Sequence, residues 1–170
     1  MFLLRLFSRI PMPILYLFSE IFYGLLYYLV KYRRKVIDEN LKNAFPSYSL
    51  KERNLIAKKF YRNFAYLVFE NIKTITISKE ELLKRVKISN VDLVERHIEQ
   101  GQTVVVLSGH FCNWEWLLLR CSLASKFPID VVYKQINIPS FEKLLIEWRS
   151  QFGATPIEMR GMMRSMVRRK

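Results

Sequence analysis

A short aliphatic run that stops at a glycine constrains the fold of this chain most strongly. Residues 104–107 read Val-Val-Val-Leu, and Gly109 follows two positions later. Consecutive apolar and β-branched residues are typical of a strand covered on both faces, which occurs almost only in parallel sheets flanked by helices. The sequence therefore predicts a central strand over 103–107 that ends in a turn.

A histidine and a glutamate follow this predicted strand, where a helix is expected to begin. If Asn113 is the helix N-cap, His110 lies in the turn and Glu115 in the first helical turn. Residues five apart in one continuous helix point about 140° away from each other, so these two side chains pair only across the loop. A histidine at the carboxyl end of a strand can act as a general base that a carboxylate orients. Glu115 also has a structural interpretation, because the helix dipole favours acidic residues in the first turn.

The pattern alternates between strands and helices from residue 86 onward. We predict strands over 86–88, 103–107, 129–133 and 155–158, separated by helices over 91–100, 114–126 and 139–152. Such alternation implies parallel strands joined by right-handed crossovers. The predicted fold class is therefore α/β with a mainly parallel sheet.

Three segments are expected along the chain. Residues 1–35 form an N-terminal membrane-associated helix with a basic flank, 36–85 form a helical segment, and 86–170 form the α/β core. Capping boxes at 49–52 and 78–81 each predict the start of a helix. The helix after the first box carries an apolar stripe that we expect to pack in the core, made of Leu55, Ile56, Phe60, Phe64, Leu67 and Val68.

Composition and one apolar tract indicate a membrane. The chain has 28 Lys and Arg against 15 Asp and Glu, yet 51% of it is hydrophobic and 14% is aromatic, which is unusual for a nucleic-acid binder. Residues 11–30 form an apolar tract long enough to cross a hydrocarbon core of about 30 Å. Glu20 lies within it, and a carboxylate at mid-membrane costs about 2.5–3.5 kcal/mol, so a helix lying in the interface is favoured over a spanning one. Basic residues that follow at once would hold this end at the cytoplasmic surface: Lys31, Arg33, Arg34 and Lys35.

Other functions fit parts of this sequence. A nucleic-acid binder would explain the charge, but the basic residues are dispersed and do not form one stripe. A cysteine hydrolase would use Cys112 with His110, and a noncatalytic membrane-anchored protein would use neither. We expect no metal, because His97, His110 and the two cysteines lack a recognisable ligand spacing. Two cysteines give no disulfide framework and fit a reducing compartment.

The tract from Gly109 to Glu115 resembles the histidine, four residues, acid motif of the lysophospholipid acyltransferase superfamily. Its form, Gly-His-Phe-Cys-Asn-Trp-Glu, is similar to that of the lipid A late acyltransferase branch. Further similarity covers nearly the whole chain and lies in Tyr32-Arg33-Arg34-Lys35, Glu39-Asn40-Leu41, Phe45-Pro46, Phe60-Tyr61-Arg62-Asn63 and Val132-Tyr133-Lys134. The resemblance implies a glycerolipid acyltransferase-like fold. Because the family is usually longer, we expect a truncated member whose sheet is incomplete at the C-terminus.

The resemblance implies a membrane-associated acyltransferase that moves a fatty acyl group from a carrier thioester to a hydroxyl of a lipid. The expected acceptor is a lipid A precursor, with a lysophospholipid as the alternative. The expected donor is acyl carrier protein or coenzyme A, and no other cofactor is implied. The enzyme would work at the cytoplasmic face of the inner membrane. For the apolar stripe of the helix after residue 49, the alternative to core packing is that part of it receives an acyl chain. A noncatalytic membrane-anchored fragment remains the alternative for a truncated chain.

The resemblance also assigns roles to individual residues. His110 would be the general base for the acceptor hydroxyl and Glu115 would orient it, with direct attack on the thioester and no covalent acyl-enzyme. Asn113 would cap the helix and line the site. Lys134 stands where the family usually has arginine, so the charge is kept but the planar fork that binds phosphate in two places is lost, and an ordinary solvated lysine is the alternative. Arg160 follows the last predicted strand, either as a phosphate ligand or as part of the basic segment 164–170.

Overall fold

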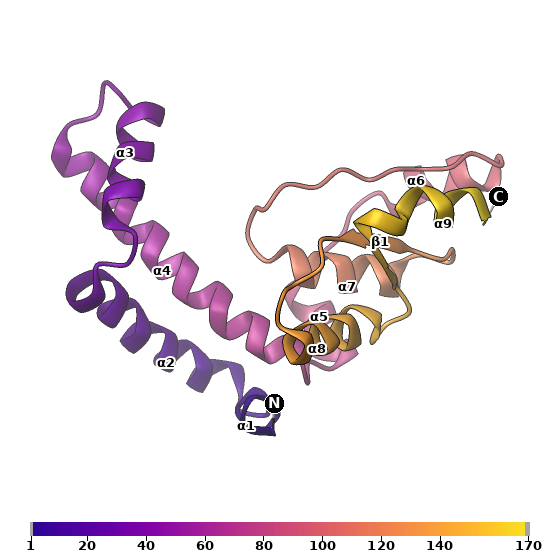
Figure 1. Ribbon diagram of the computed structural model, residues 1–170, viewed down its shortest axis with the longest axis horizontal. Helices are drawn as coiled ribbons and strands as arrows, with labels where there is room; N and C mark the ends of the chain where they lie inside the picture. The colour runs from indigo at the N-terminus through magenta and orange to yellow at the C-terminus, as the bar shows by residue number, and fades with distance from the viewer. Residues whose placement is uncertain (1, 169–170) are drawn as a thin grey trace. The chain divides into compact units, whose positions relative to one another are not determined.

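The computed structural model describes residues 2–168 and divides into two compact units. One unit is Arg9–Lys73, and the other combines the residues before Arg9 with those from Thr74 onward. Figure 1 labels most of the helices of both units. The three-segment division expected from the sequence stays a prediction.

The unit Arg9–Lys73 is helical in every regular element. Helix α2 (Met12–Gly24) continues as a π-helix, η1 (Leu25–Val30), and is followed by α3 (Arg34–Ala44) and α4 (Leu50–Thr74). Two residues in the left-handed conformation, Lys31 (φ 52°) and Arg33 (φ 49°), separate η1 from α3. The basic flank that follows the apolar tract is therefore a tight bend between two helices.

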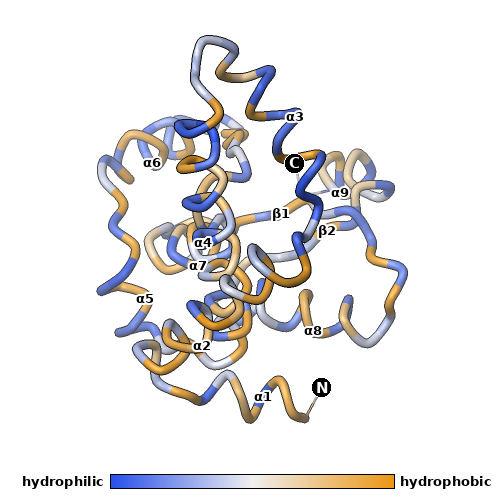
Figure 2. The backbone as a smooth tube through the Cα atoms, turned by 90° about the vertical axis from the view of Figure 1, so that its left-hand side faces the viewer, coloured by the Kyte–Doolittle hydropathy of each residue, from blue (hydrophilic) through white to orange (hydrophobic). Residues whose placement is uncertain are grey.

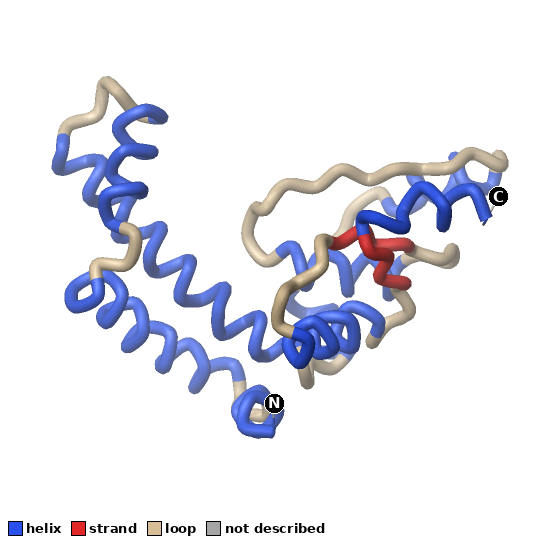
Figure 3. The backbone as a smooth tube through the Cα atoms, viewed as in Figure 1, coloured by secondary structure: helices blue, strands red, loops and turns tan. Residues whose placement is uncertain are grey.

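Helices α2 and α4 lie side by side and run in opposite directions (Figure 3). The Tyr16 hydroxyl near the start of α2 donates a hydrogen bond of 3.0 Å to Glu70 near the end of α4. Further along α2 and η1, the rings of Tyr27 and Tyr61 meet edge to face at 5.3 Å. The Tyr61 side chain is fully buried, and its hydroxyl donates to the carbonyl oxygen of Tyr32 at 2.6 Å. These contacts close the hairpin at both ends.

The apolar stripe predicted to form the core face of α4 is confirmed in part: Ile56, Phe64, Leu67 and Val68 are half-buried, but Leu55 and Phe60 are 53% and 46% exposed. Before Thr74 at its end, the fully buried residues of α4 are Ala57, Tyr61 and Ala65, which recur every four residues. Small alanine side chains let a neighbouring helix approach closely, and α4 carries apolar residues on more than one face. Hydrophobicity alone therefore placed the centre of the buried face incorrectly.

The second unit contains the only strands that residues 2–168 form. Its elements in chain order are α1 (Phe2–Ser8), α5 (Lys79–Arg85), α6 (Val91–Glu99), α7 (Trp114–Ala124), β1 (Asp130–Tyr133), α8 (Pro139–Ser150), β2 (Thr155–Glu158), the 3-10 turn η2 (Met159–Gly161) and α9 (Met162–Arg168). Strands β1 and β2 are parallel and pair from Asp130 with Thr155 to Tyr133 with Glu158. Helix α8 is the crossover between them, so the predicted strand–helix–strand unit at 129–158 is confirmed.

The strands predicted at 86–88 and 103–107 are wrong. Both segments are coil, and 103–107 belongs to a long loop between α6 and α7 (Figure 3). Leu107 is 91% exposed and Val106 is 72% exposed. A strand forms only where its backbone finds a hydrogen-bonding neighbour, and within the described residues β1 and β2 pair with each other alone. The result is a mostly helical α/β chain with a two-stranded parallel sheet.

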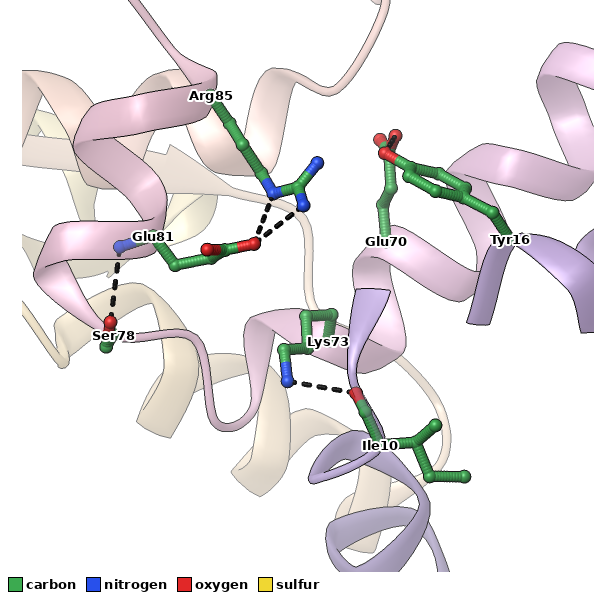
Figure 4. A network of polar contacts seen from close by, with 7 residues as sticks. All are labelled: Ile10, Tyr16, Glu70, Lys73, Ser78, Glu81 and Arg85. Carbon is green, nitrogen blue, oxygen red and sulfur yellow. Dashed lines mark hydrogen bonds and ion pairs between the residues drawn. The ribbon is translucent and has the colours of Figure 1, made fainter. Parts of the chain in front are cut away.

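The capping box predicted at 49–52 is confirmed, whereas at 78–81 Ser78 caps the helix as predicted but the Glu81 carboxylate pairs with Arg85. The Ser49 backbone N–H donates to the Glu52 carboxylate at 2.7 Å, and the Glu52 N–H donates to the Ser49 hydroxyl at 3.3 Å. At the start of α5, the Glu81 N–H donates to the Ser78 hydroxyl at 3.2 Å (Figure 4). Each hydroxyl therefore satisfies an N–H group that a helix start leaves without a partner.

The core of the second unit lies where α7 and α8 meet. Leu144, Leu145 and Trp148 of α8 form a buried cluster. From α7, Trp116 is 4% exposed, and its indole N–H donates to the hydroxyl of the fully buried Thr74 at 2.9 Å. This bond fixes the rotation of α7 about its axis, and with it the direction in which neighbouring Glu115 points.

Candidate active site

The motif loop enters α7 through a defined N-cap. The Asn113 side-chain oxygen accepts a hydrogen bond of 3.0 Å from the Trp116 backbone N–H, which confirms its predicted capping role. Cys112, one residue earlier, adopts the left-handed conformation at φ 51°. These two residues set the angle at which the loop carrying His110 meets the helix.

Glu115 points into the protein and is 5% exposed. Its Oε2 accepts hydrogen bonds from Arg149 Nε at 2.9 Å and from the Trp148 indole N–H at 3.2 Å. Its Oε1 accepts a third from Arg149 Nη2, which completes a two-pronged ion pair. A buried carboxylate needs such a partner, because an uncompensated charge in the interior is strongly unfavourable.

His110 lies in the exposed loop ahead of α7. Its ring packs edge-on against the Trp114 ring, with 4.7 Å between the ring centres. Among the described residues, no hydrogen bond or ion pair joins His110 to Glu115. The structure therefore places the two motif residues at the same helix start but does not bring their side chains into contact.

The loop conformation explains this separation. Without a strand at 103–107, the chain reaches α7 along the surface, so the His110 side chain is exposed while Glu115 faces the core. Glu115 finds its countercharge on α8 instead. The predicted position of both residues at the loop-to-helix junction is correct, and the side-chain pair across the loop is not formed.

Two cations lie at the carboxyl edge of the sheet, as predicted. Lys134 directly follows β1, and Arg160 lies in η2 directly after β2. Because β1 and β2 are parallel and end in register, both residues follow the same edge. Both side chains are exposed, which suits the binding of an anionic group. Of the basic segment at 164–170, residues 169 and 170 lie outside the described residues.

Sequence reasoning missed Arg149 and Trp148. They lie 34 and 33 residues from Glu115, so no local spacing links them to the motif. The sequence did contain one signal for Arg149. Arg149 comes four residues after Leu145 and thus lies on the apolar side of α8. A cation on that side needs a buried anion as its partner. The Arg149 guanidinium also lies 5.9 Å from the centre of the Tyr133 ring on β1.

An open groove begins just beyond Lys134. Its lining comes from the loop after β1 and from the outer side of α8, and consists of Gln135, Ile136, Asn137, Pro139, Glu142, Lys143, Ile146 and Glu147. None of the five predicted site residues lines it. Most of the exposed surface that lines the groove is apolar, although five of its eight residues are polar or charged.

The cysteines of the described residues differ in exposure. Between residues 2 and 168, no three His, Cys, Asp or Glu side chains come together where they could hold a metal ion. Cys112 is exposed, whereas burial raises the pKa of the Cys121 thiol. A raised pKa leaves less of the reactive thiolate at neutral pH.

Comparison with known proteins bears on the whole chain. The sequence model of the bacterial lipid A biosynthesis acyltransferases matches residues 1–170. Searches of curated proteins and of solved structures gave no significant match.

Proposed function

The chain belongs to the bacterial lipid A biosynthesis acyltransferase family, and we propose that it transfers a fatty acyl group from a carrier thioester to a hydroxyl of a lipid A precursor. The family makes it an acyltransferase with a lipid acceptor and an acyl donor. One observation supports assigning the chemistry to the motif loop. His110 is exposed at the start of α7, where an incoming hydroxyl can reach its imidazole, and the first turn of that helix carries a buried carboxylate.

The proposed reaction needs one base and no covalent enzyme intermediate. A neutral His110 nitrogen takes the proton of the acceptor hydroxyl as its oxygen attacks the thioester carbonyl carbon. The resulting tetrahedral intermediate expels the carrier thiolate when the carbon–sulfur bond breaks. The imidazolium then returns its proton to the thiolate, so the products are an ester and a free thiol, and the enzyme is unchanged.

The remaining site residues would bind the acceptor. Lipid A precursors are anionic, and Lys134 and Arg160 place two cations at one edge of the sheet. Asn113 is committed to capping α7, so its contribution is to hold the loop entry. For the donor we favour acyl carrier protein over coenzyme A, because an acidic carrier suits a chain with a net charge of +13.

We also propose that α2 and η1 place the enzyme on the inner membrane at its cytoplasmic face. Residues Met12–Val30 form a helix long and apolar enough to cross a membrane by length and composition, and Figure 2 shows their apolar colouring. One side of this helix exposes a continuous row of apolar residues: Ile14, Leu17, Phe18, Ile21, Leu25, Tyr28 and Leu29.

Glu20 does not interrupt this apolar row. Its carboxylate accepts hydrogen bonds from Arg62 Nε at 2.9 Å and from the Tyr66 hydroxyl, both on α4. The Glu20 carboxylate, whose charge disfavours insertion into a membrane, is thus paired on the side of α2 that faces α4. Because α4 also exposes Lys58 and Lys59, the hairpin presents basic side chains as well as the apolar row, which supports an interfacial position over a spanning one.

The catalytic proposal is tested by acyl transfer with the purified full chain, a lipid A precursor and an acyl carrier protein thioester. We expect His110→Ala to abolish transfer while the far-UV circular dichroism spectrum stays unchanged. His97→Ala is the matched control, since His97 is an exposed histidine on α6. Transfer by folded His110→Ala protein would reject the mechanism, and transfer to lysophospholipid alone would reject the acceptor.

The membrane proposal is tested by flotation with vesicles that contain anionic lipid. Leu17→Glu and Ile21→Glu place charges on the apolar row of α2 and should each weaken binding. Leu55→Glu is the control, because Leu55 is 53% exposed on α4, away from that row. Equal flotation of all three variants would show that α2 is not the membrane-binding surface.

A further inference from the structure

We infer that Arg149 and Trp148 are positioning residues that hold the Glu115 carboxylate in place for His110. The inference rests on the proposed function, because it concerns the same catalytic loop. It goes beyond the motif, since neither residue belongs to it and both come from α8. Its basis is the geometry of the three donors around one buried carboxylate.

The carboxylate is held at both oxygens. Arg149 donates through Nε to Oε2 at 2.9 Å and through Nη2 to Oε1, a pairing in which a planar guanidinium fixes both the position and the plane of its partner. Trp148 adds a third donor to Oε2 at 3.2 Å. Rotation of the Glu115 side chain would break all three bonds together.

The donors are themselves held rigidly. Trp148 is 7% exposed and belongs to the buried cluster of α8, and its ring meets the Phe141 ring edge to face at 6.0 Å. The side chains of Arg149 and Glu115 are 14% and 7% exposed. A hydrogen-bonded charge pair with so little water around it keeps one geometry, unlike an exposed pair whose partners separate freely.

One acceptor position remains open on the clamped carboxylate. An ionised carboxylate offers about four lone-pair sites, and donors among residues 2–168 occupy three of those of Glu115. Because Oε2 accepts two hydrogen bonds and Oε1 accepts one, the open site is on Oε1. In the proposed catalytic arrangement, an N–H of the His110 ring would donate to this site on Oε1 and leave the three bonds from Arg149 and Trp148 in place.

Arg149 also links the motif helix to the sheet edge. Its guanidinium lies 5.9 Å from the centre of the Tyr133 ring, and Lys134 is the next residue. One side chain therefore contacts both the carboxylate of the catalytic loop and the last residue of β1. Arg149 therefore sets the position of the Glu115 carboxylate relative to the end of β1, where Lys134 follows.

The test is a kinetic comparison of the full chain with Arg149→Lys, which keeps the charge but loses the two-pronged geometry. We expect kcat to fall about 10- to 100-fold, as for a misplaced catalytic group, with the KM values for donor and acceptor unchanged. In a Glu115→Ala background the same substitution should cause no further loss. Arg96→Lys is the matched control, because Arg96 pairs with Asp92 on the exposed face of α6.

Trp148→Phe provides a second variant that keeps the aromatic packing and removes only the indole donor. We expect it to lower kcat by about tenfold or less, again without a change in KM. If Arg149→Lys does not fold, Trp148→Phe decides the question by the same criterion.

Wild-type kcat in both variants, or a loss that persists in full in the Glu115→Ala background, would overturn the positioning role. These outcomes are distinct from failure of the proposed function. Activity in folded His110→Ala protein would reject His110 as the general base. An inactive His110→Ala protein together with unaffected Arg149 and Trp148 variants would reject only the positioning role of Arg149 and Trp148.

Discussion

The two motif residues should differ sharply in what they do for stability. Glu115→Gln keeps the side-chain volume but removes the charge that faces Arg149. The substitution leaves a guanidinium with a 14% exposed side chain without its anion, and the new amide presents a donor where Arg149 already donates. Breaking one partner of a buried ion pair costs about 3–5 kcal/mol, a large share of the 5–15 kcal/mol that is typical for a folded domain.

Urea unfolding of the purified chain, followed by far-UV circular dichroism, measures this effect. With a slope of about 2 kcal/mol per molar urea, the midpoint of Glu115→Gln should fall by about 1.5–2.5 M. Converting both partners to Met removes the buried charges together and should recover most of the loss, because a packed apolar pair can replace a buried ion pair. His110→Ala should lie within about 0.5 kcal/mol of wild type, since the residue is exposed.

An unchanged midpoint for Glu115→Gln would refute the reasoning. That result would mean that the carboxylate is solvated and that the contacts with Arg149 and Trp148 do not hold it. The prediction also bears on mutational studies of the site. Loss of activity in a Glu115 variant is informative only when the folded fraction is measured in the same preparation.

Three smaller predictions follow from other contacts. Ser49→Ala should raise the pKa of Glu52 toward its ordinary value, which an NMR titration of both proteins measures, because the Ser49 hydroxyl and N–H hold that pKa low. In wild type, the stability that these hydrogen bonds contribute is present above the pKa of Glu52 in the unfolded state and is lost as pH falls through its pKa in the folded state. Iodoacetamide at neutral pH should label exposed Cys112 well before Cys121, whose thiol pKa burial raises, and Cys112→Ser should retain acyl transfer; an inactive Cys112→Ser protein would instead favour a cysteine nucleophile. Gly153→Ala should lower stability by about 1 kcal/mol, because Gly153 has φ 99° in the turn that follows α8; an unchanged thermal unfolding midpoint would contradict this.

The elements fixed by local chemistry could be predicted from the sequence. The helix at 139–150 and the strand at 155–158 follow from a proline start, a glycine stop and the residues between them, and the structure places both within two residues of the prediction. The capping box at 49–52 and the Ser78 N-cap form as expected, because the partners in each are three residues apart.

The errors all concern partners that are far apart in the sequence. The run at 103–107 has the composition of a buried strand, but strand formation depends on a neighbour that this run does not find. The buried face of α4 depends on which residues let another helix approach, and small Ala57 and Ala65 decide it over the larger Phe60. Likewise, Glu115 was expected to face His110, whereas the buried cation of α8 is the stronger partner.

Acylation of lipid A in living cells tests the central claim most directly. In cells that carry His110→Ala in place of the wild-type sequence, mass spectrometry of extracted lipid A should show the loss of one fatty acyl chain, and the wild-type sequence should restore it. Fully acylated lipid A in cells that contain the folded His110→Ala protein, with no other acyltransferase supplying that chain, would contradict the account.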